Sequence, residues 1–340
     1  TFTHMFGGKT HPVAIELADT LAEMIPMQDA MLSFGNSGSD ANDTHIKLLR
    51  YYHEAIGKPE RRKIIARERS YHGVTVASAA LTGLPVTQNH FDLPVDALGI
   101  LRTDHPHYYR GKQGDETEAE FVERIVGNLE KMIVAEGAET IAAFIAEPIT
   151  GASGVIVPPA SYWPAVEKIC RERDVLIISD EVICGFGRTG QWFGCQTYGF
   201  TPDLLTFAKG VTNGYQPLGG VAVSDKIVEV LQSQSVEFAH GFTYSGHPVA
   251  CAAGLATLEI YKQTDIVGTL SKDLALYFNE RWRQLGEHPI VGEARTQGML
   301  GALELVRDKS SRERLAPDSA ASGFCRDRAI DHGLMVRAVK

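Results

Sequence analysis

The sequence predicts an α/β protein built around a largely parallel sheet. Short apolar runs alternate with longer amphipathic stretches through most of the 340 residues, and no repeat or low-complexity linker interrupts them, which is typical of alternating strands and helices. With 44% hydrophobic residues the chain can bury a sizeable core. Several of the apolar runs lead to polar residues that are able to carry chemistry.

The first strand–helix unit begins at Met31–Phe34, passes through Gly35-Asn-Ser-Gly-Ser39 and continues as a helix over Asp40–Ala55. Asp40 and Asp43 favour a helix N-terminus, where free N–H groups also favour a phosphate. The run matches neither the P-loop nor the G-x-G-x-x-G pattern, which disfavours nucleotide binding by those routes. Taken alone, a Gly/Ser turn that only caps the helix explains this run equally well.

Four further buried strands are expected, and polar residues follow each of them. The strands are Lys63–Arg67, Thr140–Ala146, Val175–Ser179 and Leu204–Ala208, followed in turn by Tyr71 and His72, by Glu147, by Asp180 and by Lys209. In open parallel sheets, ligands bind beyond the carboxyl ends of the strands. We therefore expect these side chains to share one site.

Two of these residues have a chemical and a structural interpretation. Asp180 could cap a strand, but an ionised carboxylate is also what a protonated pyridine nitrogen requires. Most lysines are solvated, whereas Lys209 follows an apolar strand, where it can lose its proton and act as nucleophile or base. Asp180, Lys209, the aromatic Tyr71 and the turn Gly35–Ser39, which can bind a phosphate, provide the contacts that pyridoxal phosphate needs.

Four segments resemble, in order and spacing, the class III pyridoxal-phosphate-dependent aminotransferases: Glu147–Gly151, Asp180–Gly190, Ala208–Gly210 and Thr243–Pro248. The resemblance covers essentially the whole chain. It implies the fold type I transferase architecture, with a large domain containing a mostly parallel seven-stranded sheet and a smaller C-terminal α/β domain. We expect a large cofactor-binding domain over 1–265 and a small domain over 266–340.

The resemblance also implies roles for individual residues at the cofactor. Lys209 would hold pyridoxal 5'-phosphate as a Schiff base and carry the transferred proton, and Asp180 would pair with the ring nitrogen. Further contacts to the ring or its phosphate would come from Ser37, Gly38, Ser39, Tyr71, His72, Glu147 and Val182. For Glu147, a structural helix cap after the strand is the competing interpretation.

Other implied contacts lie further along or at the ends of the chain. Thr243 would reach the phosphate of a neighbouring subunit's cofactor, which requires a homodimer or a dimer of dimers. Arg337 resembles the mobile arginine that pairs with substrate carboxylates, although it could equally be a plain surface arginine. Tyr71 and Phe6 would line the substrate pocket, with core packing the alternative for Phe6.

The expected reaction is ping-pong transfer of an amino group from an amine or ω-amino acid to a keto acid. The resemblance leans toward ω-aminotransferases that use pyruvate, and it leaves 2-oxoglutarate, the donor amine and the stereopreference open. The alternatives are another pyridoxal-phosphate enzyme, namely an aminomutase, racemase or decarboxylase, or a non-catalytic binder of a phosphate ligand. Retained function after Lys209→Ala would favour the binder.

Composition argues against several other classes of protein. The net charge of −9 and the lack of a basic block disfavour nucleic acid, and no apolar run approaches the roughly 18 residues of a membrane span. The five cysteines are widely spaced without a C-x-x-C pair, which fits a reduced cytoplasmic protein. His105-Pro-His107 suggests no third metal ligand. Because the sequence starts at Thr1 and ends just after a strand-like run from Gly333, we expect residues beyond both ends and an incomplete small domain.

Overall fold

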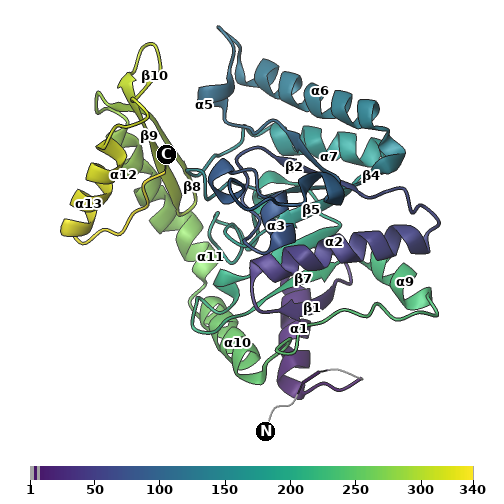
Figure 1. Cartoon of the computed structure of the whole chain (residues 1–340). Coiled ribbons are helices and arrows are strands. Elements are labelled where there is room, and N and C mark those ends of the chain that lie inside the picture. Colours follow the sequence, from purple (N-terminus) through teal and green to yellow (C-terminus); the bar gives the residue numbers. More distant parts are fainter. Residues whose placement is uncertain (1–3, 6–7, 340) are drawn as a thin grey trace.

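The computed structural model describes residues 4–5 and 8–339 and places a seven-stranded sheet at its centre (Figure 1). The strands in spatial order are β1 (Met31–Gly35), β7 (Gly219–Val223), β6 (Leu204–Phe207), β5 (Leu176–Asp180), β4 (Ile141–Ala146), β2 (Lys63–Arg67) and β3 (Ile100–Thr103). β7 runs in the opposite direction to the other six strands, which are parallel to one another. The predicted, mostly parallel α/β sheet is therefore confirmed.

Helices cover both faces of this sheet, so that the core consists of two apolar layers. On β4 all six residues are buried, and successive side chains point to opposite faces. Phe144 belongs to the layer under α1 (Pro12–Met24), α6 (Glu118–Glu136), α7 (Tyr162–Glu172) and α10 (Pro248–Gln263). Ile145 belongs to the layer under α2 (Gly38–Ala55), α3 (Val76–Leu81) and α9 (Asp225–Ser233).

Short helices occupy the connections between these elements. They are α4 (Val95–Leu98), α5 (Tyr108–Gly111), α8 (Gly194–Tyr198) and the 3-10 turns η1 (Pro85–Thr87), η2 (Ala138–Thr140) and η3 (Lys209–Val211). The predicted strands end within a residue or two of the observed ones. Thr140, expected in a strand, lies in η2, and Ala208 lies just beyond β6. Among the described residues, no helix combines the length and the apolar character of a membrane span.

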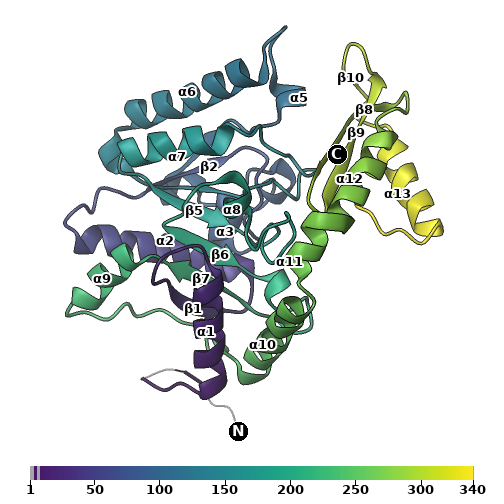
Figure 2. The same cartoon turned by 180° about the vertical axis from the view of Figure 1, so that it is seen from behind.

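A second sheet lies to one side of the main body in both views (Figures 1 and 2). It contains β8 (Val291–Gln297), β9 (Leu300–Asp308) and β10 (Glu313–Arg314), and α11 (Ile266–Thr269), the π-helical η4 (Leu270–Leu274) and α12 (Ala275–Leu285) lead into it. α13 (Ala321–Asp331) follows, and residues 334–339, expected to be strand-like, lie outside any helix or strand. The division after residue 265 stays a prediction.

Charged and backbone groups fasten the second sheet to the main body, in a region that we call the junction. Arg295 on β8 donates to the carbonyl oxygens of Gly154 (2.6 Å from Nη2) and Val155 (2.9 Å from Nε). The same guanidinium pairs with Glu293 at 2.7 Å and Glu304 at 3.2 Å.

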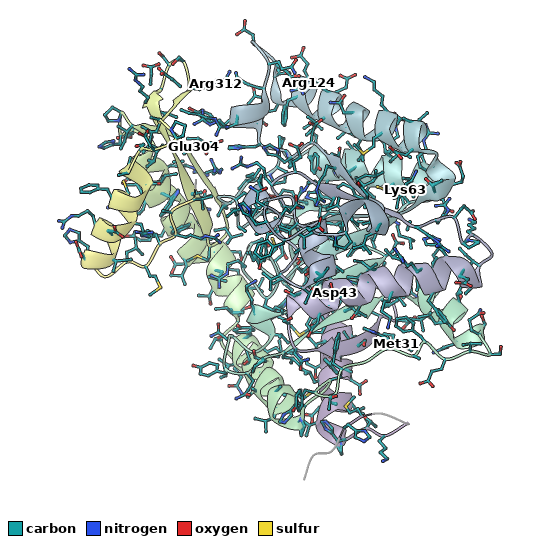
Figure 3. All side chains as sticks on the ribbon, viewed as in Figure 1. Met31, Asp43, Lys63, Arg124, Glu304 and Arg312 are labelled. Carbon is teal, nitrogen blue, oxygen red and sulfur yellow. The ribbon has the colours of Figure 1, made fainter. Side chains whose placement is uncertain are left out.

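Two further contacts belong to the junction. Glu304 also accepts from Arg110 on α5 at 2.8 Å, and Arg312 donates to Tyr109 O at 2.9 Å. Figure 3 labels Glu304 and Arg312, which lie where this sheet meets the main body.

Candidate active site

A cavity of 380 Å³ opens at the carboxyl ends of the parallel strands. It is lined by Asn36, Ser37, Gly38, Ser39, Tyr71, His72, Gly73, Glu147, Asp180, Val182, Ile183, Ala208, Lys209, Thr212, Gly214, Gln216, Pro217 and Leu218. Most of the residues singled out from the sequence are among these. The strand ends of β1, β4, β5 and β6 thus deliver their polar residues to one place.

Lys209 enters the cavity directly after β6, in a strained part of the backbone. Its φ is +41°, a left-handed conformation that side chains other than glycine rarely adopt. A Cβ on the next residue, Gly210, would lie 2.9 Å from Phe186, so the turn needs a glycine there. Burial lowers the pKa of Lys209, with Asp180 and Glu147 opposing the shift. A larger share of the amine is therefore uncharged and able to act as nucleophile or base.

Asp180 lies at the end of β5 and is 2% exposed. Its Oδ2 accepts from Asn42 Nδ2 and His72 Nδ1, both at 2.8 Å, and its Oδ1 accepts from Val182 N at 3.2 Å. Donors on both oxygens fix the orientation of the carboxyl group. Oδ1 keeps a lone pair for one more donor, which is what a protonated ring nitrogen provides.

The N-terminus of α2 forms the anion-binding end of the cavity. Ser37 Oγ accepts from Asp40 N at 3.3 Å, and the Asp40 carboxylate accepts from Asn36 N and Ser37 N at 2.9 and 3.0 Å, which closes a capping box. No acceptor for the N–H groups of Gly38 and Ser39 is found among the described residues. These two groups, at the positive end of an 18-residue helix, suit a phosphate.

Close packing explains two glycines at this end. A Cβ on Gly38 would lie 2.7 Å from Val182 Cγ2, and one on Gly73 would lie 2.6 Å from Ser39 Oγ. The absence of these side chains lets the helix terminus, the Val182 side chain and the loop after Tyr71 meet around the cavity. The hollow between them is one that an added methyl group would disturb.

Glu147 lies between the cavity and the loop that follows β4. Its Oε1 accepts from Tyr71 N at 3.0 Å and its Oε2 from Gly151 N at 2.9 Å. Burial raises its pKa, and His72 and these N–H groups oppose that rise. The carboxyl group therefore fixes Tyr71 at the cavity wall as well as facing the cavity itself.

These residues fit pyridoxal phosphate in each part of the molecule. The α2 N-terminus suits the phosphate, Asp180 suits the ring nitrogen, Tyr71 and Val182 line the walls, and Lys209 presents an amine. Among the described residues, no group of three or more potential metal ligands occurs.

Three expected contacts are not brought into this cavity. Thr243 and Arg337 are exposed and do not line it. Phe6 lies outside the described residues. The roles expected for these residues stay predictions.

Sequence reasoning missed the polar residues behind Asp180. Asn42 and His45 project from α2, and Thr206 lies on β6, all of them buried. A usable signal was present, because Asn42 and His45 are three residues apart on the same helix face as the buried Ile46 and Leu49. Polar residues on a buried helix face call for a hydrogen-bond partner.

Comparison with known proteins agrees with this site. The sequence pattern of the family described as aminotransferase class III matches residues 1–340. The putrescine–pyruvate aminotransferase of Pseudomonas aeruginosa is 46% identical over 338 residues, covering 99% of this chain and 73% of that protein. The chloroplastic gamma aminobutyrate transaminase 3 of Solanum lycopersicum is 45% identical over 340 residues, covering 99% and 65%.

Solved structures give the same relationship. The omega transaminase from Pseudomonas jessenii in complex with PMP superposes with a TM-score of 0.96 at 44% identity, covering 99% of this chain and 74% of that one. The chain spans 65% to 73% of the length of the two relatives above.

Proposed function

Because the chain belongs to the class III aminotransferases, a family of pyridoxal-phosphate enzymes, we propose that it transfers an amino group from an amine or ω-amino acid to pyruvate. The observation that carries the proposal is the convergence of Lys209, Asp180 and the α2 N-terminus on one cavity. The cofactor, when bound, supplies an electron sink for the carbon next to the transferred nitrogen.

Lys209 is the proposed catalytic residue. Its Nζ would hold the cofactor in the resting enzyme. During the reaction Nζ would be the base that takes the proton from the substrate carbon next to nitrogen, and it would return that proton on the cofactor side of the same nitrogen. Burial supports both tasks, because it lowers the pKa of Lys209 and so makes the neutral amine more available at neutral pH.

The other residues bind and orient. Asp180 Oδ1 would hold a proton on the ring nitrogen, since the orientation of the carboxyl group is already fixed by Asn42, His72 and Val182 N. Gly38 N–H, Ser39 N–H and the Ser39 hydroxyl would bind the phosphate. Ser37 contributes by capping the helix that presents these groups.

Two observations support an ω-amine donor and a keto acid acceptor. The bacterial relative is named for putrescine and pyruvate and the plant relative for gamma-aminobutyrate, and both donors carry a primary amine at the end of a short chain. The lining of the cavity combines the apolar Val182, Ile183 and Leu218 with the polar Gln216. We assign Arg337 as the group that pairs with the acceptor's carboxylate.

A homodimer is part of the proposal. Val74 and Tyr215 directly follow the lining residues Gly73 and Gly214 and are 71% and 77% exposed. Such apolar exposure at the mouth of a site is typical of a surface that another subunit covers. Thr243 would then reach the phosphate in the second subunit. A cytoplasmic location is also proposed, since all five cysteines are free.

The test of this function is visible absorption of the protein with pyridoxal phosphate, followed by a terminal diamine and then pyruvate. We expect a band that bleaches with the amine and returns with pyruvate as alanine appears. Lys209→Ala should lack the band, whereas Lys168→Ala, at an exposed lysine, should match the wild type. A band that forms and then ignores every keto acid, pyruvate and 2-oxoglutarate included, would move the enzyme to aminomutase, racemase or decarboxylase chemistry.

A further inference from the structure

A chain of buried side chains continues from Asp180 away from the cavity. Asn42 Nδ2 lies 2.8 Å from Asp180 Oδ2, Thr206 Oγ1 lies 2.7 Å from Asn42 Oδ1, and His45 Nε2 lies 2.8 Å from Thr206 Oγ1. Asn42, Thr206 and His45 are each 0% exposed. Three polar groups are thus desolvated in a row, which is costly unless every link is a hydrogen bond.

Chemistry fixes the direction of each link. Asn42 Nδ2 faces two acceptors, Asp180 Oδ2 and His72 O at 2.7 Å, so both of its hydrogens are used and the amide cannot be turned over. Asn42 Oδ1 is therefore an acceptor, and the single hydroxyl hydrogen of Thr206 points to it. Thr206 Oγ1 can then only accept from His45.

His45 must consequently carry its proton on Nε2. Burial lowers the pKa of His45 to about 3, so the ring is neutral at working pH and holds one N–H. That N–H is at Nε2, because Thr206 has no hydrogen left to donate. Every donor along the chain thus points toward Asp180, and each hydrogen bond polarises the next in the same sense.

The remaining groups around Asp180 do not replace this chain. His72 donates to the same oxygen, while Glu147 and Lys209 face Asp180 from the segments that follow β4 and β6. None of these three contacts Asn42 Oδ1. The rotamer of the Asn42 amide is held from behind by Thr206, and Thr206 is held by His45.

We propose that His45 is a positioning residue that, through Thr206 and Asn42, orients the amide on Asp180 and so sets how firmly the ring nitrogen of pyridoxal phosphate keeps its proton. The proposal rests on the proposed pairing of Asp180 with that nitrogen. It gives a role in cofactor binding to a residue that lies two side chains away from Asp180.

The same helix provides an internal control. His53 is also on α2 and is 3% exposed, and burial lowers its pKa to about 4. Its Nε2 lies 3.4 Å from the backbone oxygen of Ala142 and has no link to Asp180. His53→Phe therefore measures how much a phenyl ring under α2 weakens cofactor binding when the hydrogen bonds from Asp180 to His45 are left in place.

The experiment compares variants that remove a link with variants that keep it. His45→Phe and Thr206→Val remove one link each, whereas His45→Gln keeps an N–H and Thr206→Ser keeps the hydroxyl. The readouts are the dissociation constant of pyridoxal phosphate and the pH titration of the ¹⁵N chemical shift of its ring nitrogen. A third readout is the ¹⁵N spectrum of the histidine side chains in the cofactor-free wild type.

We expect His45→Phe and Thr206→Val to bind pyridoxal phosphate about tenfold more weakly. The ring nitrogen should lose its proton about one pH unit lower in these variants. His45→Gln, Thr206→Ser and His53→Phe should stay within about twofold of the wild type. The wild-type spectrum should show His45 protonated at Nε2 alone.

Two results would overturn the proposal. One is wild-type affinity and an unshifted nitrogen titration in both link-removing variants. The other is a loss of affinity in His45→Gln and His53→Phe as large as in His45→Phe, which would mean that only packing matters. If His45→Phe does not fold, the Thr206 pair and the histidine spectrum decide, and a proton on Nδ1 of His45 refutes the assignment. Failure here leaves the amine-to-pyruvate test untouched, because that test depends on Lys209.

Discussion

The floor of the cavity and the junction are both polar, but they use different groups. The floor, which we define as Asn42, His45, His72, Asp180 and Thr206, contains one carboxylate held by an amide, a hydroxyl and two imidazoles, all at most 2% exposed. At the junction, charged side chains pair with each other, and Glu293 and Glu304 remain 27% and 19% exposed.

This difference indicates what each region is for. Neutral hydrogen-bonding groups have strict directions, so the floor holds one charge in one orientation. Ion pairs tolerate a change of geometry and respond to salt and pH. A floor of this kind suits a fixed cofactor, whereas the junction holds the second sheet on the main body through pairs that depend on salt and pH.

The largest effect is expected when one charge is removed from each region. Asp180→Asn places an amide where three donors already point, and it would leave the ring nitrogen without an anion. We expect kcat/KM for amine and pyruvate to fall about 10³-fold. Glu304→Gln at the junction should stay within about threefold. Equal losses in the two variants would mean that the floor has no special role.

The second largest effect is expected from Arg295→Met, which tests the junction alone. Arg295 is the only described residue that joins both junction glutamates to the carbonyls of Gly154 and Val155. Its loss removes the donor to the partly buried carbonyl oxygens of Gly154 and Val155 and leaves Glu293 and Glu304 with His107 and Arg110 alone. We expect the free energy of unfolding in urea to drop by about 3 kcal/mol. Arg307→Met, at an exposed pair with Glu313, should change it by less than about 0.5 kcal/mol.

Gly298→Ala should have a smaller effect on the same region. Gly298 has a φ of +58°, and a Cβ there would lie 2.5 Å from Arg188 O and from Thr189 C. The substitution should lower the free energy of unfolding by about 2 kcal/mol, because the backbones at the junction must move apart. Gly323→Ala on α13 meets nothing within 4 Å, and it should be neutral or slightly stabilising. Thermal melts of both variants check this, and equal melting temperatures would contradict it.

The smallest effect is the change of stability with pH, which occurs in a different pH range for the floor and for the junction. The pKa of His45 falls from 6.5 to about 3 on folding. Below pH 6.5 the His45 imidazole therefore binds a proton in the unfolded chain but stays neutral in the folded protein. Stability from this group is therefore full above pH 6.5 and declines as the pH falls toward 3. At pH 5.5, His45→Gln should lose about 1 kcal/mol less than the wild type relative to pH 7.5.

The junction carboxylates act in a lower window. Burial alone would raise the pKa of Glu293 and Glu304, but hydrogen bonds and charges from His107, Arg110 and Arg295 lower both below their ordinary 4.5. Their contribution is present above pH 4.5 and is lost as the pH falls through the lowered values. The stability gap between wild type and Arg295→Met should therefore stay constant from pH 7.5 to 5.5 and narrow below 4.5. Urea titrations at each pH measure both windows, and a single shared window would contradict the comparison.

The sequence predicted those parts of the fold and site that depend on local patterns. Apolar runs such as Lys63–Arg67 mark central strands. The residues that follow β4, β5 and β6 share a cavity, as expected because ligands bind beyond the carboxyl ends of parallel strands. β7 was not predicted, because Gly219-Gly-Val-Ala-Val has small residues where a buried strand usually shows large ones.

The hidden part of the site depends on contacts between distant segments. Asn42 and Thr206 are 164 residues apart in sequence, and their hydrogen bond exists only because α2 crosses β6 in one register. The junction is similar, since Arg295 and Gly154 are 141 residues apart. No local pattern reports such a register. Polar residues on a buried helix face indicate that hydrogen-bond partners exist, but they do not identify the partner residues.

The reversed direction of β7 has a consequence for how the gene can vary. The segment from Lys209 to Leu218 leaves β6 and enters β7 at the same edge of the sheet, so both of its ends are anchored beside the cavity. New chain termini or an insertion within 211–217 would remove or loosen the connection of Lys209 to β7 and leave it held by β6 alone. An exposed loop tip such as Gly114 carries no such constraint. Length variation between descendants of this gene should therefore accumulate at loops of the second kind and be absent from the lysine loop.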